Sequence, residues 1–469
     1  MVEIRFLHQD KEEKKKYPIF SPAKKTKAII GGVKLNKEQK KAIHSFLSLT
    51  LMAVLIAGVL FVFQYAISWI EEFLSLDFEA TALNITLYFF GIVLLSVLEY
   101  FLMVPPFYKG NVAAMVRLVE RKKKVPFLKG IVSVFLCCLI SFLIGVPLGG
   151  EGPSVFIGAL LAEGLFLWSH NKEEILSEIE VGAGTGYATA FLNPLAGFFY
   201  FVEHSKKNRK KKKLFKAGYV LLVSYFLMVL FRFLQGNGDP FHYSLFRNGL
   251  EGMQSFEHSL LFLVIPPLCY FVALLFKKVV LNMRIPNATN KTSILVLSTL
   301  CSVILVLTLK FTENSSLLGI GTSLISAVSK LTAEDALLFF LVRFVFTALA
   351  FDFFYAGGQV LPTMTVGYLL GLLAISLFSS VLPLSEQETT LFSLITMLSF
   401  YASVSDNYLT SFALSFSFGP FLVMVLPSLV CILFVFLLDR FVFDTPSLSR
   451  MIVNRDKESE TYERMLHAD

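Results

Sequence analysis

The chain has 469 residues, of which 55% are hydrophobic, 14% aromatic and 16% charged, with a formal net charge of +7. Soluble domains of this length carry about 25% charged residues, and here the charges are clustered, which leaves long uncharged runs. This pattern predicts an all-α protein that crosses a bilayer several times. A transmembrane β-barrel is excluded, because it would need short segments of alternating polarity.

Clustered basic residues predict how the chain lies in the cell membrane. Residues 1–44 are polar and basic, which predicts a cytoplasmic arm and no signal peptide. Residues 121–124 and 206–213 are also basic and predict cytoplasmic loops under the positive-inside rule. Residues 444–469 predict a short cytoplasmic tail, so we expect both chain ends in the cytoplasm. These positions explain the positive charge, which therefore does not indicate nucleic-acid binding.

The apolar runs predict a membrane domain over residues 45–443, with a first repeat at about 45–235 and a second at about 257–443. Several apolar segments are too short to cross a core of about 30 Å, or are broken by glycine and proline. The helices that we expect lie at about residues 46–70, 83–104, 127–148, 153–168, 181–202 with a break at 193–194, 219–233, 258–280, 293–311, 336–355, 362–378, 389–402 and 418–441. The connections that we expect are a half-helix within 107–124 and polar loops at 169–180 and 235–257.

One carboxylate stands between glycines in the middle of this apolar sequence. The run reads Gly149-Gly150-Glu151-Gly152-Pro153. An ionisable group at membrane depth is rare and usually faces a cavity or a partner. Pro153 is suited to the first turn of a helix, whose free N–H groups attract an anion or Glu151 itself. The run therefore predicts a gated anion site, or alternatively a glycine-rich hairpin with Glu151 at the lipid headgroups.

The second half of the chain contains a similar run. It reads Gly357-Gly358-Gln359-Val360-Leu361-Pro362. A glycine follows each proline five positions later, Gly158 in the first run and Gly367 in the second. Further along, residues 191–195 have an echo in residues 405–409. Interrupted segments at matching places in two halves are the best sequence pointer to a transporter site.

These residues resemble the CLC family of chloride channels and proton-coupled chloride exchangers. Residues 149–153 are similar to the family's GKEGP or GREGP box, and residues 357–362 to its GGxFxP box. Residues 193–197, Asn-Pro-Leu-Ala-Gly, together with Glu203, resemble the APLAG…E segment between the two boxes. The order and rough spacing agree, and the resemblance covers most of residues 45–450.

The resemblance implies an inverted-repeat bundle of about eighteen tilted and broken helices, without cytoplasmic regulatory domains. It also implies a homodimer in the lipid bilayer, with one pathway for chloride or a related halide in each subunit. The glutamate that matches Glu151 is the family's external gate, and in exchangers it carries the proton. The backbone that would bind the anion belongs to two loops, comprising Gly149, Gly150, Gly152, Pro153, Gly358, Gln359, Val360 and Leu361.

Several positions depart from the family pattern. The serine of the GSGIP box is replaced by Met103, and the chloride-coordinating tyrosine, aligned on Pro446, by Leu448. With both hydroxyl ligands lost, we expect weak chloride binding by backbone N–H groups unless other residues substitute. The residue after Glu203, where exchangers carry an internal proton-transfer glutamate, is His204. Glu203 and His204 are therefore candidates for an internal proton path, or alternatively structural residues at a helix end.

Two further functions stay open at this point. A fluoride-exporting branch of the family also has methionine at the serine position, although that branch usually changes the proline that Pro153 retains. A transport-inactive scaffold with the same fold would also explain the lost hydroxyl ligands. An enzyme is not expected, because no second catalytic group accompanies Glu151 and the histidines are scattered. No motif suggests a cofactor or a metal site.

Overall fold

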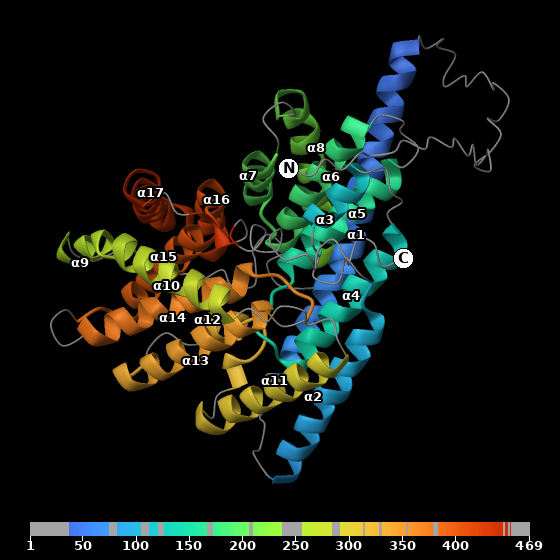
Figure 1. Cartoon of the computed structure of the whole chain (residues 1–469). Helices are drawn as coiled ribbons and strands as arrows, with labels where there is room; N and C mark the ends of the chain where they lie inside the picture. The colour runs from blue at the N-terminus through green and yellow to red at the C-terminus, as the bar shows by residue number, and fades with distance from the viewer. Residues whose placement is uncertain are drawn as a thin grey trace, which may run out of the picture. The chain divides into compact units, whose positions relative to one another are not determined.

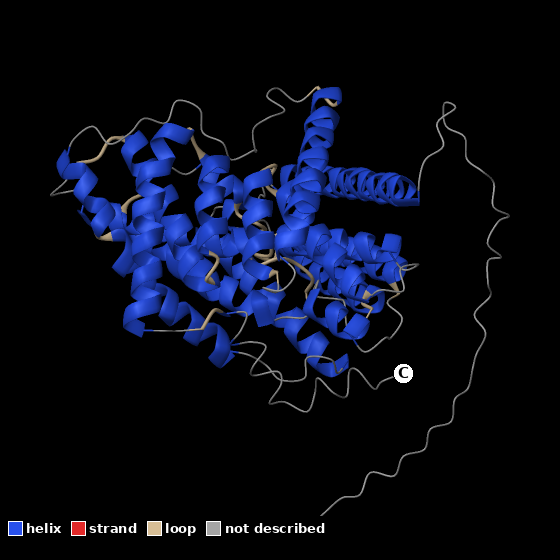
Figure 2. Cartoon of the chain, turned by 90° about the horizontal axis from the view of Figure 1, so that it is seen from above, coloured by secondary structure: helices blue, strands red, loops and turns tan. Residues whose placement is uncertain are grey.

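The computed structural model describes residues 37–74, 82–104, 112–120, 126–166, 172–205, 210–236, 256–283, 291–312, 315–327, 331–352, 355–378, 383–443, 446–448 and 451. In these ranges the secondary structure is helical, without a strand (Figure 2). The chain separates into two units, Met1–Leu47 and Ser48–Asp469, and the second contains every site discussed below. Six helical segments among the described residues are long and apolar enough to span a bilayer.

The helices of the first half are labelled in Figure 1. They are α1 (Lys37–Leu74), α2 (Ala82–Leu102), α3 (Val112–Glu120), α4 (Phe127–Ile144), α5 (Glu151–Phe166), α6 (Lys172–Ala190), α7 (Pro194–His204) and α8 (Lys210–Leu234). The predicted half-helix at 107–124 is present as α3. The predicted break at residues 193–194 is confirmed, because α6 ends before it and α7 begins at Pro194.

The second half begins with α9 (Phe256–Leu260), the 3₁₀ turn η2 (Leu261–Leu263) and α10 (Ile265–Met283). It continues with α11 (Lys291–Thr312), η3 (Ser315–Leu317), α12 (Thr322–Ala327), α13 (Ala333–Asp352), α14 (Val360–Phe378), α15 (Glu386–Ser405), α16 (Tyr408–Phe418), α17 (Phe421–Leu437) and the π-helical turn η4 (Leu438–Phe443). The helix expected at 258–280 is interrupted at η2. Pro266 then lies in the first turn of α10, where its missing N–H leaves no bond unmade.

The predicted polar loop at 169–180 is wrong over most of its length, because α6 already begins at Lys172. One of its acidic residues, Glu178, pairs within the protein instead of facing solvent. Glu178 is fully buried and accepts a charged hydrogen bond of 2.8 Å from Lys216 of α8. Since α8 begins at Lys210, the last part of the basic run at 206–213 is also helical.

Helix α16 was missed by the sequence analysis, which predicted no helix between residues 402 and 418. Its serines and threonines lower the local hydrophobicity, so the segment does not resemble a membrane helix. In the structure the hydroxyls bond to carbonyls of the preceding turn, as Ser411 does to Asn407 at 2.6 Å and Ser415 to Phe412 at 2.6 Å. The polar groups are thus satisfied inside the bundle.

The two halves repeat the same packing. Helix α5 packs on α6 as α14 packs on α15, while α7 packs on α8 and α16 on α17. Glycine allows close approach at equivalent places. A Cβ on Gly158 would lie 2.3 Å from the carbonyl oxygen of Gly182, and one on Gly367 would lie 2.8 Å from the Phe400 Cβ. The glycine spacing in the sequence therefore reflects tight pairs of helices.

The echo between residues 191–195 and 405–409 is also present in the backbone. Leu192 and Asp406 are the described non-glycine residues with positive φ, at 48° and 58°. Each directly precedes an asparagine, Asn193 or Asn407, that stands immediately before α7 or α16. These two helices also contact each other. The duplicated turn therefore brings equivalent parts of both repeats together.

Asn193 joins the two repeats at this contact. Its Oδ1 accepts the Ala196 N–H at 3.0 Å, and its Nδ2 donates at 2.8 Å to both the Ala413 carbonyl and the Ser417 hydroxyl. Replacing Asn193 with alanine removes three bonds from a buried position, so we expect a loss of roughly 2–3 kcal/mol of stability. The apparent unfolding temperature of the purified protein in detergent measures this loss.

Asn407→Ala is the matched control for that experiment. Asn407 occupies the equivalent turn, but its side chain makes no cap bond and donates to the Tyr401 hydroxyl at 3.4 Å. We expect its replacement to lower the unfolding temperature by much less. Equal effects of the two substitutions would contradict a special role of Asn193 in joining the repeats.

Candidate functional site

The two glycine-rich loops meet in the interior of the protein. Gly149 donates its N–H to the Gly358 carbonyl at 2.7 Å, and Gly358 returns a bond of 2.5 Å to Gly149. Helices α5 and α14 begin directly after these residues, so their N-termini lie close together. Each end carries free N–H groups and partial positive charge, and the two ends together favour an anion. The third helix start that was expected here, near Pro106, lies outside the described residues.

Glu151 is the acidic group at this junction. It begins α5, is 2% exposed, and its carboxylate accepts the backbone N–H groups of Leu361 and of Glu151 itself. Its Oε2 is buried and has no hydrogen-bond partner. The carboxylate of the first repeat therefore occupies a backbone donor of the second repeat. Glu151 is therefore enclosed by the protein.

The other residues of the two loops lie around this carboxylate. Gly152 packs against the backbone of the opposite loop, since a Cβ on it would lie 2.8 Å from the Gly358 Cα. Pro153 occupies the third position of α5, as Pro362 does in α14. The remaining predicted loop residues occur at equivalent places before and at the helix starts: Gly150, Gln359, Val360 and Leu361. The structure thus brings together the two loops that the sequence singled out.

Met103 and Leu448 are the residues at the expected positions of the central ligands. Met103 follows α2, is partly buried, and donates its N–H to the Glu99 carbonyl at 3.1 Å. Leu448 is 2% exposed, and two positions before it the Pro446 carbonyl accepts a bond of 3.2 Å from the Lys277 Nζ. Neither Met103 nor Leu448 has a side-chain N–H or O–H group to offer an anion.

Glu203 and His204 lie at the end of α7. The Glu203 carboxylate accepts the N–H groups of Leu409 at 2.8 Å and Thr410 at 3.2 Å, and the Thr410 hydroxyl at 2.5 Å. Glu203 thereby binds the N-terminus of α16, where a negative charge is favourable. His204 is exposed, its Nδ1 lies 2.9 Å from the Tyr200 carbonyl, and its ring stacks on that of Tyr200 at 4.1 Å.

Two buried tyrosines that the sequence analysis did not single out lie in the same region. The hydroxyls of Tyr187 on α6 and Tyr401 on α15 are 3.4 Å apart. Tyr187 interacts electrostatically with Glu151, and Tyr401 with Glu203. A sequence signal was available, because each tyrosine lies six positions before the asparagine of the duplicated turn.

Three further charged residues within apolar segments are buried inside the bundle. Glu99 is fully buried and accepts the Ala356 N–H at 2.8 Å and the Ser141 hydroxyl at 3.0 Å. Arg343 is also fully buried and donates bonds of 2.7 Å to the carbonyls of the 317–320 segment. Glu163 on α5 is 2% exposed. The side chain of Asp352 lies outside the described residues.

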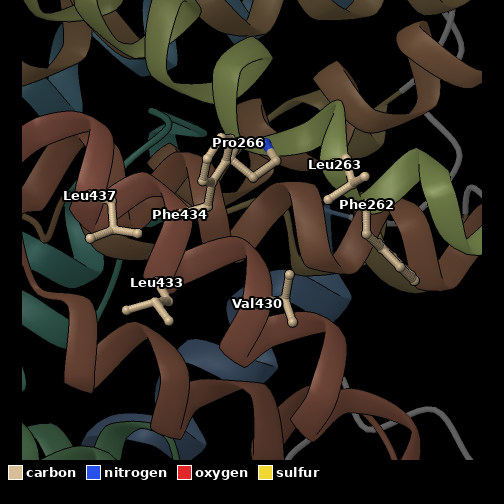
Figure 3. Close-up of a pocket in the computed structure, with 7 residues that line it drawn as sticks. All are labelled: Phe262, Leu263, Pro266, Val430, Leu433, Phe434 and Leu437. Carbon is tan, nitrogen blue, oxygen red and sulfur yellow. The ribbon is translucent and has the colours of Figure 1, made fainter. Parts of the chain in front are cut away.

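An apolar pocket lies away from this site, between η2, α10 and α17 (Figure 3). Its lining contains no charged or hydrogen-bonding side chain. The lining residues are Phe262, Leu263, Pro266, Val430, Leu433, Phe434 and Leu437. This pocket offers nothing to an anion, so the loops around Glu151 are the candidate site.

Comparison with known proteins identifies the family. The family described as voltage gated chloride channel matches residues 92–440. This match covers most of the chain, and the protein therefore belongs to the voltage-gated chloride channel, or CLC, family. A comparison with curated protein sequences gives no match.

Solved structures of this family are similar in fold. A slow cyanobacterial Cl⁻/H⁺ antiporter aligns with a TM-score of 0.72 and 17% identity, covering 89% of this chain and 98% of that one. A CLC-type fluoride/proton antiporter gives 0.65 and 20%, covering 85% and 96%. A eukaryotic CLC transporter gives 0.66 and 18%, covering 88% and 74%. The predicted family and the predicted CLC-type helical fold are thus confirmed.

Proposed function

We propose that this protein transports chloride or a related halide through a pathway that Glu151 gates, with exchange of protons. The observation that carries the proposal is the buried Glu151 carboxylate on the Leu361 N–H, at the junction of two helix N-termini. A carboxylate and a halide are both anions, so they compete for the same backbone donors. The similar fluoride/proton and chloride/proton antiporters support the same general activity.

Gating follows from the charge of Glu151. The ionised carboxylate is held by the donors and blocks the anion, whereas the protonated group loses most of this attraction. Low pH should therefore favour the arrangement in which Glu151 has left the anion site. Each time the halide replaces the carboxylate at this site, Glu151 can carry a proton. At the other end, we propose His204 as the proton entry, because it is exposed and an imidazole titrates near neutral pH. Glu203 remains the second candidate there, although three donors already hold its carboxylate.

Fluoride is the second candidate substrate. Met103 stands where the family's serine is expected, as in the fluoride-exporting branch, and a fluoride/proton antiporter is among the similar structures. The retained Pro153 favours the chloride-type branch. The position of Met103 beside α2 is compatible with either ion, so the substrate is decided by measurement.

Halide efflux from liposomes tests the proposal. Purified protein is reconstituted into vesicles loaded with chloride or fluoride, and ion release is recorded with ion-selective electrodes; protein-free vesicles are the control. We expect release well above that of protein-free vesicles for at least one halide, increasing as the pH is lowered. Release of fluoride but not chloride would assign the fluoride branch. No release of either ion would support the transport-inactive scaffold and contradict the proposed function.

Topology and assembly complete the proposal. We propose that both chain ends lie in the cytoplasm. In this orientation the basic runs at 121–124 and 206–213 lie in cytoplasmic loops, as the positive-inside rule requires. We further propose a homodimer with one pathway per subunit, as the family resemblance implies.

A further inference from the structure

Each repeat brings one tyrosine hydroxyl to the same buried place. Tyr187 lies six positions before Asn193, and Tyr401 lies six positions before Asn407. The tyrosines are 1% and 4% exposed, and their hydroxyl oxygens are 3.4 Å apart. The internal symmetry of the fold therefore places two O–H groups face to face inside the bundle.

This tyrosine pair lies within electrostatic range of both carboxylates of the proposed pathway. Tyr187 interacts with Glu151, and Tyr401 interacts with Glu203. The ring of Tyr187 also stacks on Tyr200 at 4.6 Å, and Tyr200 stacks on His204 at 4.1 Å, which links the pair to the Glu203 end of α7. A halide that travels between this end and Glu151 is expected to pass the tyrosine pair. No other side-chain donor is available at the expected ligand positions, because these hold Met103 and Leu448.

The hydroxyls are poorly satisfied by each other. An O–H···O bond usually measures about 2.7–2.8 Å, so a contact of 3.4 Å is weak. Asn407 donates its Nδ2–H to the Tyr401 hydroxyl at 3.4 Å, and Ser405 is a further side-chain donor to the same oxygen. Both bonds use acceptor lone pairs and not the hydroxyl hydrogen. The ring of Tyr187 is held by stacking on Tyr200 at 4.6 Å. The rings are held in place, while each hydroxyl hydrogen can rotate about its C–O bond. Such hydroxyl groups can donate to an anion while it is bound and turn away when it leaves.

We propose that Tyr187 and Tyr401 donate hydrogen bonds to the halide in transit, and so replace the missing serine and tyrosine ligands of the family. The inference rests on the proposed transport function and adds the side chains that bind the anion in this chain. Hydrogen bonds to a charged partner are stronger than bonds between neutral groups. A phenol carries no charge of its own, so it can bind the halide without trapping it.

The test removes only the hydroxyls. Tyr187→Phe, Tyr401→Phe and the double variant retain the rings and nearly the same volume. Tyr270→Phe on α10 is the control, because its hydroxyl bonds to Asp439 at 3.4 Å, outside the tyrosine pair. Binding of sodium chloride and sodium fluoride is measured by calorimetry, and halide efflux is measured in liposomes.

We expect each single variant to bind the preferred halide about tenfold more weakly, and the double variant to bind it more weakly still. The control should bind like the wild type. Wild-type affinity in both single variants, with transport intact, would overturn the inference and leave the proposed function standing. A wild-type protein that neither binds nor transports a halide would overturn both.

A second measurement uses the wild-type protein and therefore tests the inference even if the variants do not fold. Halide titration of the wild-type protein should change its near-UV tyrosine absorbance in a saturable way, with the same affinity as the calorimetry. The absence of any saturable change, in a protein that binds halide by calorimetry, would overturn the role of the tyrosines.

Discussion

Replacement of Glu151 by glutamine should abolish proton movement while halide flux continues. Glutamine retains the size of the side chain but cannot take up and release a proton. The amide also lacks the charge that holds the carboxylate on the Leu361 N–H, so the anion no longer has a competitor. In liposomes, wild-type flux should increase as the pH falls, whereas flux through Glu151→Gln should be nearly independent of pH.

Glu163→Gln is the matched control for this experiment. Glu163 is a second buried carboxylate on α5, twelve residues later and so about 18 Å along the helix. Its neutralisation should leave both pH dependence and proton movement close to those of the wild type. A Glu151→Gln protein that keeps pH-dependent, proton-coupled flux would remove Glu151 from the mechanism.

Gly358→Ala should reduce halide flux at least as strongly as any other single change in the loops. A Cβ at this position would lie 2.5 Å from the Gly152 nitrogen and 3.0 Å from the Glu151 Oε2. The Gly152 backbone cannot move away from this Cβ unless the two loops separate. The substitution therefore lowers the stability of the protein by about 1–3 kcal/mol, or it displaces the start of α14. We expect the halide flux per reconstituted protein to fall to about one tenth of the wild-type flux, or to a still lower value.

Gly218→Ala controls for the general effect of adding a methyl group. Gly218 lies in α8, and a Cβ there would meet no atom within 4 Å. Alanine is also the better helix former, so this variant should be as stable as the wild type or more stable. Equal flux through Gly358→Ala and Gly218→Ala would contradict the close apposition of the two loops.

The sequence was sufficient to predict the family, the helical class and the two loops that meet. These features depend on local signals, because glycine-rich runs followed by a proline favour a break in the backbone and then the start of a helix. Glu151 was recognisable since a charge among apolar residues is costly unless it has a use. The duplicated turn was also visible in advance, as residues 191–195 and 405–409 show.

The features that were missed depend on tertiary contacts. Helix α6 begins earlier than predicted because Glu178 pairs with Lys216 from a distant helix. Helix α16 tolerates its serines and threonines because their hydroxyls bond to its own carbonyls and its N-terminus bonds to Glu203. Tyr187 and Tyr401 lie 214 positions apart, and only the packed repeats bring them to one place.

Uphill proton transport is the most direct test of the central claim. Liposomes that contain the wild-type protein are given a halide gradient without a pH gradient, and the internal pH is followed with a fluorescent indicator. Movement of halide down its gradient should drive protons in the opposite direction, and Glu151→Gln should show halide movement alone. Absence of halide movement in the wild type, or proton movement that persists in Glu151→Gln, would contradict a halide pathway gated by Glu151.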